Sequence, residues 1–387
     1  MRSVSSASLS TTSTATPSYS EASARYNLRN TKFTIDYSAP SPPPPNPLDL
    51  TPPLGCSVDN IVFFGRGNRV HYKNLTVSEE VGQLCKLQDG HGDLRIIECA
   101  GSDQPDMVAL ATSKGFVQLW DIKSKKATAS WTIKGVTAMR WNGPVLTIGG
   151  SKGAIRHYDT RISPTPKMKE QARKVTRHQA RITSLEWNMD GKILASGDQT
   201  GMIYCWDSRD KVPLDVGEFV QRRKKMQHAG TISALSWCTW QSKLLASGDD
   251  KGTIQVWSAS TTNAVDLPGK LELGAPVTGL HFASACKELL STHGAQPTQV
   301  DASVVSTSQN WPRVNMANSI VVHSYPSLRH VTTLSISGKP IANSILIANG
   351  TKLVVALPEE NKINVCDVWC KKKELRRQTS FRNSTIR

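Results

Sequence analysis

The chain repeats a short unit in which strand-like runs alternate with turns. From about residue 56 onwards, runs of alternating apolar and polar residues lie between Gly, Asp and Asn turns, as in residues 107–121 and 193–207. A period of two is typical of a β-strand with one buried face. The runs also recur at a longer spacing, because the mean distance between equivalent strand ends is close to the roughly 40–45 residues of one propeller blade. These ends are Lys73, Trp120, Tyr158, Trp206, Trp257, His323 and Cys366.

These units predict an all-β fold, a seven-bladed WD-repeat β-propeller. One such unit cannot bury its own apolar face, whereas a ring of sheets buries every face against a neighbour. The pattern is clearest in residues 178–207 and 228–257, which both begin with His and end near Trp. In WD repeats these side chains form a buried hydrogen-bonded network. We therefore expect His178, Trp206, His228 and Trp257 to be structural, with no metal site and no catalytic role.

The composition divides the chain into three regions. Residues 1–53 are rich in Ser, Thr and Pro, so we expect a disordered N-terminal arm. Residues 54–370 form the predicted propeller, and residues 371–387 form a short basic tail that ends in Ile386-Arg387. An apolar side chain, a guanidinium and a carboxylate at one end suit capture in a groove with an apolar pocket and polar partners.

Charge and motif content narrow the function classes. The formal net charge of +16 favours acidic partners. From the sequence we expect no membrane span, no secretory signal and no cofactor. Its eight cysteines form no CxxC pair and indicate reduced thiols in an intracellular protein. Residues 149–153 match GxSxG, but a strand rather than a helix follows, so we expect a hairpin turn and no enzyme.

Several segments resemble one subgroup of WD proteins. Residues 114–121 (KGFVQLWD), 141–162, 235–248 and 287–294 (KELLSTHG) are similar to the Fizzy and Fizzy-related activators of the anaphase-promoting complex, and lean to the Fizzy-related branch. The resemblance extends over residues 94–334 and is weak in the first and last blades. The Ile-Arg ending is also typical of that family.

The resemblance implies a substrate-recruiting activator, or adaptor, without an active site. In that family the propeller binds destruction-box and KEN-type degradation motifs, and an N-terminal C-box and the C-terminal Ile-Arg dock on helical-repeat subunits of the ligase. The C-box-like segment here is 24–29 (ARYNLR). The implied ligase-docking residues are Ile386, Arg387, Arg25, Tyr26 and Arg29, and the implied degron-binding residues are Gln199, Asp249, Asn364 and Asp59.

The departures from the family pattern suggest altered substrate choice. The C-box-like segment lacks Ile-Pro, an acidic residue is missing before the first blade, and about twenty residues are inserted between Gly294 and Ser319. A specialised, meiosis-specific activator fits these departures. Two alternatives stay open: a basic WD-repeat scaffold in RNA or ribosome assembly, and a degenerate propeller that inhibits the ligase. Weak aromatic interleaving, with 6% aromatic residues, disfavours nucleic acid.

Regulation and location are further expectations. Thr16, Ser41 and Thr51 each precede a Pro in the arm and are candidates for proline-directed phosphorylation. A phosphate would add about −1.5 to −2 charges near Arg25 and Arg29. Basic clusters at 222–225 and 371–377, where the sequence predicts no strand, fit a nuclear-import patch, so we expect the protein in the nucleus and the cytoplasm.

Overall fold

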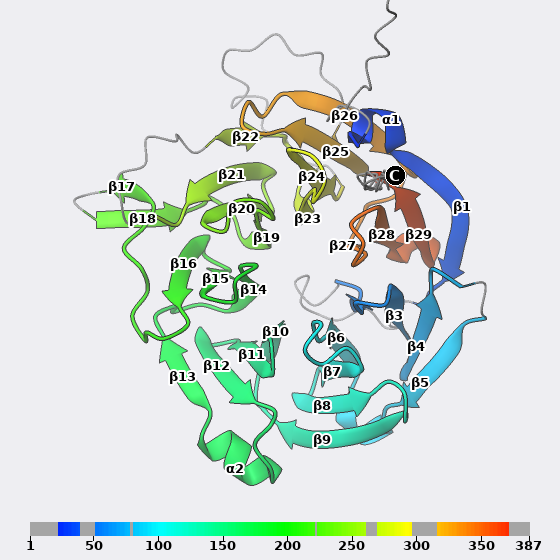
Figure 1. Cartoon of the computed structure of the whole chain (residues 1–387), viewed down its shortest axis with the longest axis vertical. Helices are drawn as coiled ribbons and strands as arrows, with labels where there is room; N and C mark the ends of the chain where they lie inside the picture. The colour runs from blue at the N-terminus through cyan, green and yellow to red at the C-terminus, as the bar shows by residue number, and fades with distance from the viewer. Residues whose placement is uncertain are drawn as a thin grey trace, which may run out of the picture.

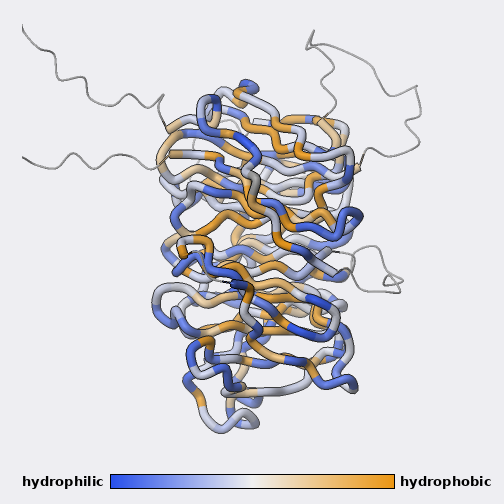
Figure 2. Tube along the Cα trace, turned by 90° about the vertical axis from the view of Figure 1, so that its right-hand side faces the viewer, coloured by the Kyte–Doolittle hydropathy of each residue, from blue (hydrophilic) through white to orange (hydrophobic). Residues whose placement is uncertain are grey.

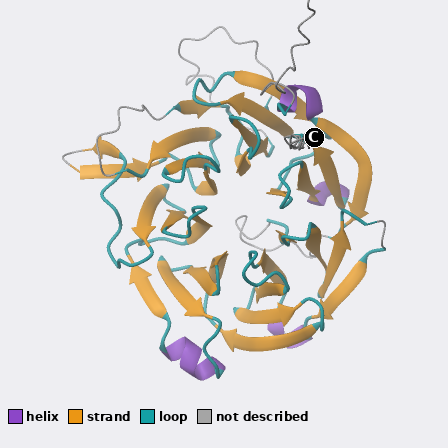
Figure 3. Ribbon diagram, in the orientation of Figure 1, coloured by secondary structure: helices purple, strands orange, loops and turns teal. Residues whose placement is uncertain are grey.

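The chain folds into a ring of β-sheets. The computed structural model describes residues 22–38, 51–77, 80–220, 223–260, 269–295 and 316–370. These residues form seven sheets around a central axis, seen face-on in Figure 1. Figure 3 shows that strands account for nearly all of the regular structure. The predicted seven-bladed all-β propeller is confirmed.

We call the sheets blades 1 to 7 and give their strands from the first strand outwards. Blades 1 and 2 are β2 (Leu54–Cys56), β3 (Ile61–Arg66), β4 (Arg69–Asn74), β5 (Gly82–Lys86), then β6 (Leu94–Cys99), β7 (Met107–Thr112), β8 (Phe116–Asp121), β9 (Lys126–Thr132). Blade 3 is β10 (Val136–Asn142), β11 (Val145–Gly150), β12 (Ala154–Asp159), β13 (Arg173–Thr176). Blade 4 is β14 (Ile182–Trp187), β15 (Ile193–Asp198), β16 (Met202–Asp207), β18 (Arg223–Gln227), β17 (Glu218–Val220).

The remaining blades complete the ring. Blade 5 is β19 (Ile232–Trp237), β20 (Leu244–Asp249), β21 (Thr253–Ser258), β22 (Lys270–Glu272). Blade 6 is β23 (Val277–Phe282), β24 (Glu288–His293), β25 (Ser319–Ser324), β26 (His330–Ser335). Blade 7 is β27 (Asn343–Leu346), β28 (Lys352–Leu357), β29 (Lys362–Asp367), β1 (Arg29–Asp36). The short helices are α1 (Ala24–Asn27), α2 (Thr165–Glu170), η2 (Asp89–His91) and η3 (Pro358–Glu360).

The last blade is built from both ends of the described chain. Strand β1 pairs antiparallel with β29, from Arg29 opposite Asp367 to Asp36 opposite Lys362. It lies along the outer edge of blade 7 in Figure 1. The predicted boundary between a disordered arm and a propeller at residue 54 is therefore wrong for residues 29–36, which belong to the fold. Residues 29–36 join the fold because they supply the edge strand of blade 7 from the opposite end of the chain and so close the ring.

The blades pack closely at the centre. Each first strand contacts the first strand of the next blade, and β27 contacts β2, so the ring is closed. The second strands β15 and β20 are buried at every position. A Cβ at Gly197 would lie 2.4 Å from Ile232 Cγ2, and one at Gly248 would lie 2.5 Å from Val277 Cγ1. Glycine at these positions lets neighbouring blades approach. Figure 2 shows apolar and polar residues alternating along the trace.

The predicted strand ends occupy one structural position. Every one is the next-to-last residue of the third strand of its blade: Lys73, Trp120, Tyr158, Trp206, Trp257, His323 and Cys366. The GxSxG segment is a hairpin turn between β11 and β12, as predicted. The basic residues Arg223–Lys225 lie within β18, which corrects the prediction that this cluster lies outside strands. In the described part of the chain, no helix reaches the length and apolarity of a membrane span.

Candidate peptide-binding face and docking segments

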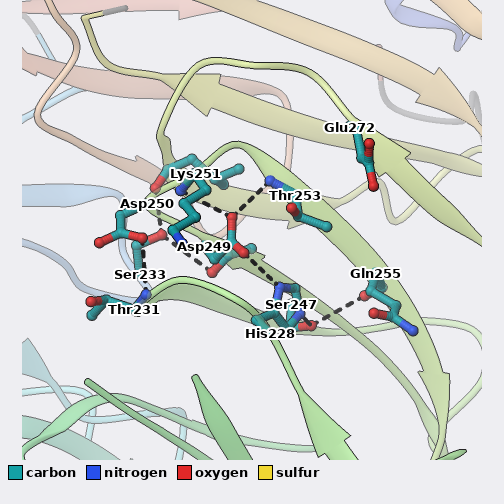
Figure 4. Close-up of polar contacts among 12 residues, drawn as sticks. His228, Thr231, Ser233, Ser247, Asp249, Asp250, Lys251, Thr253, Gln255 and Glu272 are labelled. Atoms are coloured by element: carbon teal, nitrogen blue, oxygen red, sulfur yellow. Dashed lines mark hydrogen bonds and ion pairs between the residues drawn. The ribbon is translucent and has the colours of Figure 1, made fainter. Parts of the chain in front are cut away.

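Blades 4 and 5 each contain a four-residue hydrogen-bonded network, which confirms the predicted structural role of their His and Trp residues. In blade 4 His178 Nδ1 lies 2.6 Å from Asp198 Oδ2, and Nε2 lies 2.7 Å from Ser196 Oγ. Trp206 Nε1 donates to the same Ser196 Oγ at 2.8 Å. In blade 5 the equivalent residues are His228, Ser247, Asp249 and Trp257, drawn without the Trp in Figure 4.

The aspartates of these networks also shape the turns that follow them. Asp198 Oδ1 accepts from the backbone N–H groups of Thr200 and Met202 at 2.8 and 3.1 Å. Burial raises the pKa of Asp198, but the hydrogen bonds from His178, Thr200 and Met202 outweigh burial, so the pKa lies below its usual range. The same balance lowers the pKa of Asp249. Both carboxylates are therefore ionised and hold the turns after β15 and β20.

The turns between the second and third strands repeat one geometry on one face of the ring. The first turn residue donates its backbone N–H to a carbonyl of the segment that leads into the first strand, with N–O distances of 2.8–3.0 Å in blades 2 to 5. The following residue is Lys, Lys, Thr or Lys. The exposed pairs are Ser113-Lys114, Ser151-Lys152, Gln199-Thr200 and Asp250-Lys251. These turns form what we call the tip face, a rigid backbone surface with three lysines.

Of the predicted degron-binding residues, Gln199 lies on the tip face and is exposed. Thr231 Oγ1 donates to the Gln199 carbonyl at 3.2 Å, and the Thr231 N–H donates to Asp250 Oδ1 at 2.9 Å. Asp250 is therefore next to Gln199 and takes the equivalent position in blade 5, as Figure 4 shows for the Thr231–Asp250 pair. Together Gln199, Thr231 and Asp250 form a polar platform between blades 4 and 5.

The prediction for Asp249 is wrong. Its side chain is fully buried and bound to His228, so a surface peptide cannot reach it. Asp250, one residue later, was missed by the sequence reasoning. The signal that could have found it is the parallel with Asp198-Gln199, because in each blade the inward aspartate precedes the exposed turn residue.

Asn364 and Asp59 lie apart from that platform. Asn364 is 6% exposed in β29, and its Oδ1 has no hydrogen-bond partner among the described residues. It lies near the β28–β29 turn of blade 7, which joins the second and third strands as the turns of the tip face do. Asp59 is exposed in the turn between β2 and β3, at the opposite ends of the strands. The structure therefore does not bring the four predicted degron residues together.

The predicted N-terminal docking residues lie on a segment anchored to blade 6. Buried Glu288 accepts hydrogen bonds from Ser23 Oγ at 2.6 Å, Ala24 N at 3.0 Å and Trp369 Nε1 at 2.8 Å. This anchor positions α1, where Arg25 is exposed and Tyr26 is 68% exposed. Arg29 instead pairs with Asp367 at 2.9 Å within blade 7. Arg25 and Tyr26 thus face solvent, while Arg29 stabilises the closing strand.

Other predicted sites fall on the margins of the fold. Ile386, Arg387, Thr16 and Ser41 lie outside the described residues. Thr51 is exposed just before β2. Among the residues that the structure describes, no three potential metal ligands gather. All eight cysteines are unpaired, and burial raises the pKa of thiols such as Cys205 to about 12.

A charged bridge between first strands was not predicted from the sequence. Arg140 on β10 binds Glu98 on β6 at 2.9 Å through Nη1 and Glu186 on β14 at 2.8 Å through Nε. Burial raises the pKa of Glu98 and Glu186, and the guanidinium of Arg140 works against that rise. The bridge joins blades 2, 3 and 4. Nothing in the local pattern marks these residues, because each partner lies more than forty residues away along the chain.

Comparison with known proteins supports the fold and the resemblance. The family described as "WD domain, G-beta repeat" matches residues 169–207 and 220–258, which contain the first three strands of blades 4 and 5. The crystal structure of a mitotic checkpoint complex contains a chain that superposes with a TM-score of 0.69 and 23% identity, covering 88% of this chain and 94% of that one. That likeness shows the propeller fold.

Curated relatives point to one group of proteins. WD repeat-containing protein slp1 of Schizosaccharomyces pombe is 32% identical over 55% of this chain and 41% of its own length. Meiotic fizzy-related protein 1 of the same organism is 26% identical over 72% and 59%. "Cell division cycle 20.5, cofactor of APC complex" of Arabidopsis thaliana is 29% identical over 62% and 50%. The chain spans about half the length of these relatives. Two of its blades match the WD-repeat model, and the chain is related in sequence to the Fizzy and Fizzy-related proteins.

Proposed function

We propose that this protein is a substrate-recruiting adaptor of the anaphase-promoting complex. The observation that carries the proposal is the sequence match along the propeller to a relative named as a cofactor of that complex. The match to a meiotic fizzy-related protein favours a meiotic role. An adaptor contributes binding surfaces, and its partners transfer ubiquitin, so the role requires no catalytic residue in this chain.

The tip face supplies a surface for a degradation motif. A KEN-type peptide carries one Lys, one Glu and one Asn. Asp250 and the nearby Gln199 offer a carboxylate and an amide to the Lys and Asn, while Lys251 offers an ammonium to the Glu. Exposed charge pairs steer and align partners more than they add affinity. We therefore infer a site of modest affinity at Gln199, Thr231 and Asp250.

Two segments supply docking to the ligase. Arg25 and Tyr26 project from α1, whose position is fixed by Glu288. The second docking element in this proposal is the C-terminal pair Ile386 and Arg387. We also propose that the protein acts in the nucleus and the cytoplasm. Phosphorylation at Thr16, Ser41 and Thr51 would control its docking.

Affinity purification of the tagged full chain from dividing and meiotic cells tests the association. We expect ligase subunits to co-purify with the wild type and to fall at least tenfold with Arg25→Glu/Tyr26→Ala. Lys86→Glu/Lys126→Glu, which changes exposed lysines on β5 and β9, is the matched control. Recovery of RNA or ribosomal proteins in place of ligase subunits would contradict the adaptor role and favour the basic scaffold.

An inhibitor of the same ligase is the second candidate. The observation that favours it is the burial of Asp249 and Asn364, which removes two of the predicted degron contacts from the surface. A KEN-type peptide separates the two candidates. An adaptor binds the peptide, and Asp250→Lys weakens that binding about tenfold. An inhibitor that lacks a degron site binds neither that peptide nor a scrambled one.

A further inference from the structure

The outer edge of blade 4 is split between two segments. Strand β18 pairs with β16 only at Met202 opposite Gln227 and Ile203 opposite Met226. Further along β16, Leu214 N donates to Cys205 O at 2.7 Å, and Trp206 forms a bridge with Pro213. The outer edge of β16 is thus shared by β18 and by the segment 211–216, and a groove of about 440 Å³ lies between these two segments.

The groove has an apolar floor and a basic rim. Its floor includes Tyr204, Cys205, Leu214, Val216 and Met226. The charged residues that line it are four cations and one carboxylate: Arg177, Lys211, Lys224, Lys225 and Asp215. The groove therefore combines apolar contact area with an excess of positive charge.

The cations of the rim are available to a partner. Among the described residues, none of the four forms an ion pair with a carboxylate of the chain. Lys224 Nζ lies 5.4 Å from the ring centroid of Phe219 on β17, a cation–π contact that does not use a carboxylate. Gln255 donates to Glu218 at 2.8 Å, so the β17–β18 hairpin is tied to blade 5 and holds the rim in place.

Apolar side chains are exposed beside the groove. Val212 is 72% exposed, Phe219 is 75% exposed and Val220 is 42% exposed. Figure 1 shows the β17–β18 hairpin projecting from the outside of the ring. Exposed apolar side chains at a groove with polar edges are typical of a surface that binds another protein.

We propose that this groove binds an extended acidic peptide segment of a partner protein, with one apolar side chain seated between β18 and the segment 211–216. The charge of the rim selects the acidic residues, and the floor around Tyr204 and Leu214 takes the apolar side chain. The site is on the outer edge of blade 4, apart from the tip face, and it does not depend on the proposed function.

The test uses a short fluorescent probe peptide of Glu and Gly with one central Leu. Its anisotropy is titrated with the full chain, and a second probe has Gln in place of each Glu. We expect Lys224→Glu/Lys225→Glu to weaken binding of the acidic probe at least tenfold. Lys86→Glu/Lys126→Glu changes the net charge equally on other outer strands and leaves binding within twofold.

Two further binding measurements complete the test. We expect the Gln probe to bind at least tenfold more weakly than the Glu probe, and Leu→Gly in the acidic probe to weaken it severalfold. Urea unfolding of both double variants checks that each is folded. Equal weakening by the two double variants, or equal binding of the Glu and Gln probes, would overturn the proposal, because the attraction would then be a property of the whole surface.

Discussion

Blades 5 and 6 place different buried polar residues at one equivalent position. In blade 5, Ile232 faces Asp249 across the first two strands, and Asp249 binds His228. In blade 6, Val277 faces His293 at the same register, and Leu273 stands where blade 5 has His228. His293 Nδ1 donates to Ala275 O at 3.0 Å, and Nε2 lies 2.8 Å from Ser291 Oγ.

The comparison shows that the fold requires satisfied polar atoms rather than a fixed set of residues. Blade 5 places an ionised carboxylate beside an imidazole, whereas blade 6 places one neutral imidazole between a hydroxyl and a carbonyl. Both arrangements leave the second strand fully buried. They differ in their response to acid, because burial lowers the pKa of His293 to about 4.

The largest expected effect is in the ionised network. Asp249→Ala removes a buried acceptor from His228 and from the N–H groups of Lys251 and Thr253. We expect the free energy of unfolding to fall by about 3 kcal/mol, measured by urea denaturation. The neighbouring Asp250→Ala is the matched control and should change it by less than about 0.5 kcal/mol. Equal unfolding midpoints would show that the network does not stabilise blade 5.

The anchor of the N-terminal segment comes next. Glu288→Ala leaves Ser23, Ala24 and Trp369 without their acceptor, and we expect a local loss of about 2 kcal/mol. Trypsin should then cleave after Arg25 at least tenfold faster. Glu170→Ala in α2, where the side chain is exposed, is the control. An unchanged cleavage rate would mean that other contacts hold the segment.

The acid response separates the two blades. Burial lowers the pKa values of His281, His293 and His323 in blade 6 to about 4, against roughly 6.5 when unfolded. The unfolded chain therefore binds more protons between these values, and stability falls as pH drops from about 6.5 to 4. The pKa values of Asp198 and Asp249 are low in the folded state, so these carboxylates contribute stability that is lost only as the pH falls below about 3.9, the pKa of an unfolded Asp.

A variant assigns that response to blade 6. His323→Phe keeps an aromatic ring and removes one titrating group. Between pH 7 and 5 it should reduce the loss of unfolding free energy by about 1–2 kcal/mol, since one pKa unit corresponds to about 1.4 kcal/mol. Thermal unfolding across this range measures it. If the variant and the wild type lose stability in parallel, the buried histidine does not control the acid response.

The smallest effect is expected at an exposed ion pair. Arg209 binds Asp207 at 2.8 Å on the surface of blade 4, and hydrogen bonding with Arg209 lowers the pKa of Asp207. Solvent screens such pairs, so Arg209→Ala should not shift the urea midpoint measurably. Arg140→Ala is the contrasting change, because it leaves Glu98 and Glu186 unpaired between blades. A larger effect for Arg209→Ala would reverse this ranking.

The periodic features of the sequence predicted most of the fold. The strand-end residues identified all seven third strands, because apolar periodicity and turn residues are local signals. Strand β1 was missed, since its partner Asp367 lies at the other end of the chain. The Ser- and Pro-rich sequence on either side of β1 also obscured its strand pattern. Ring closure is a long-range property that no local pattern encodes.

The candidate site was less predictable for a related reason. Asp249 and Asp250 are chemically alike, and only the turn geometry decides which one faces inward. The exposed turn residue was found in blade 4, where Gln199 differs from its neighbour Asp198. Resemblance pointed to the turn after β20 in blade 5, where Asp249 is the buried and Asp250 the exposed one of two adjacent carboxylates.

The adaptor role is tested most directly by reconstituted ubiquitin transfer. Purified anaphase-promoting complex without an activator is mixed with a substrate carrying a KEN-type motif, with and without this protein. We predict that the protein stimulates ubiquitin chain formation on the substrate at least tenfold, and that both Asp250→Lys and mutation of the motif remove most of the stimulation. No stimulation, or suppression of the activity of an added activator, would contradict the account and identify an inhibitor.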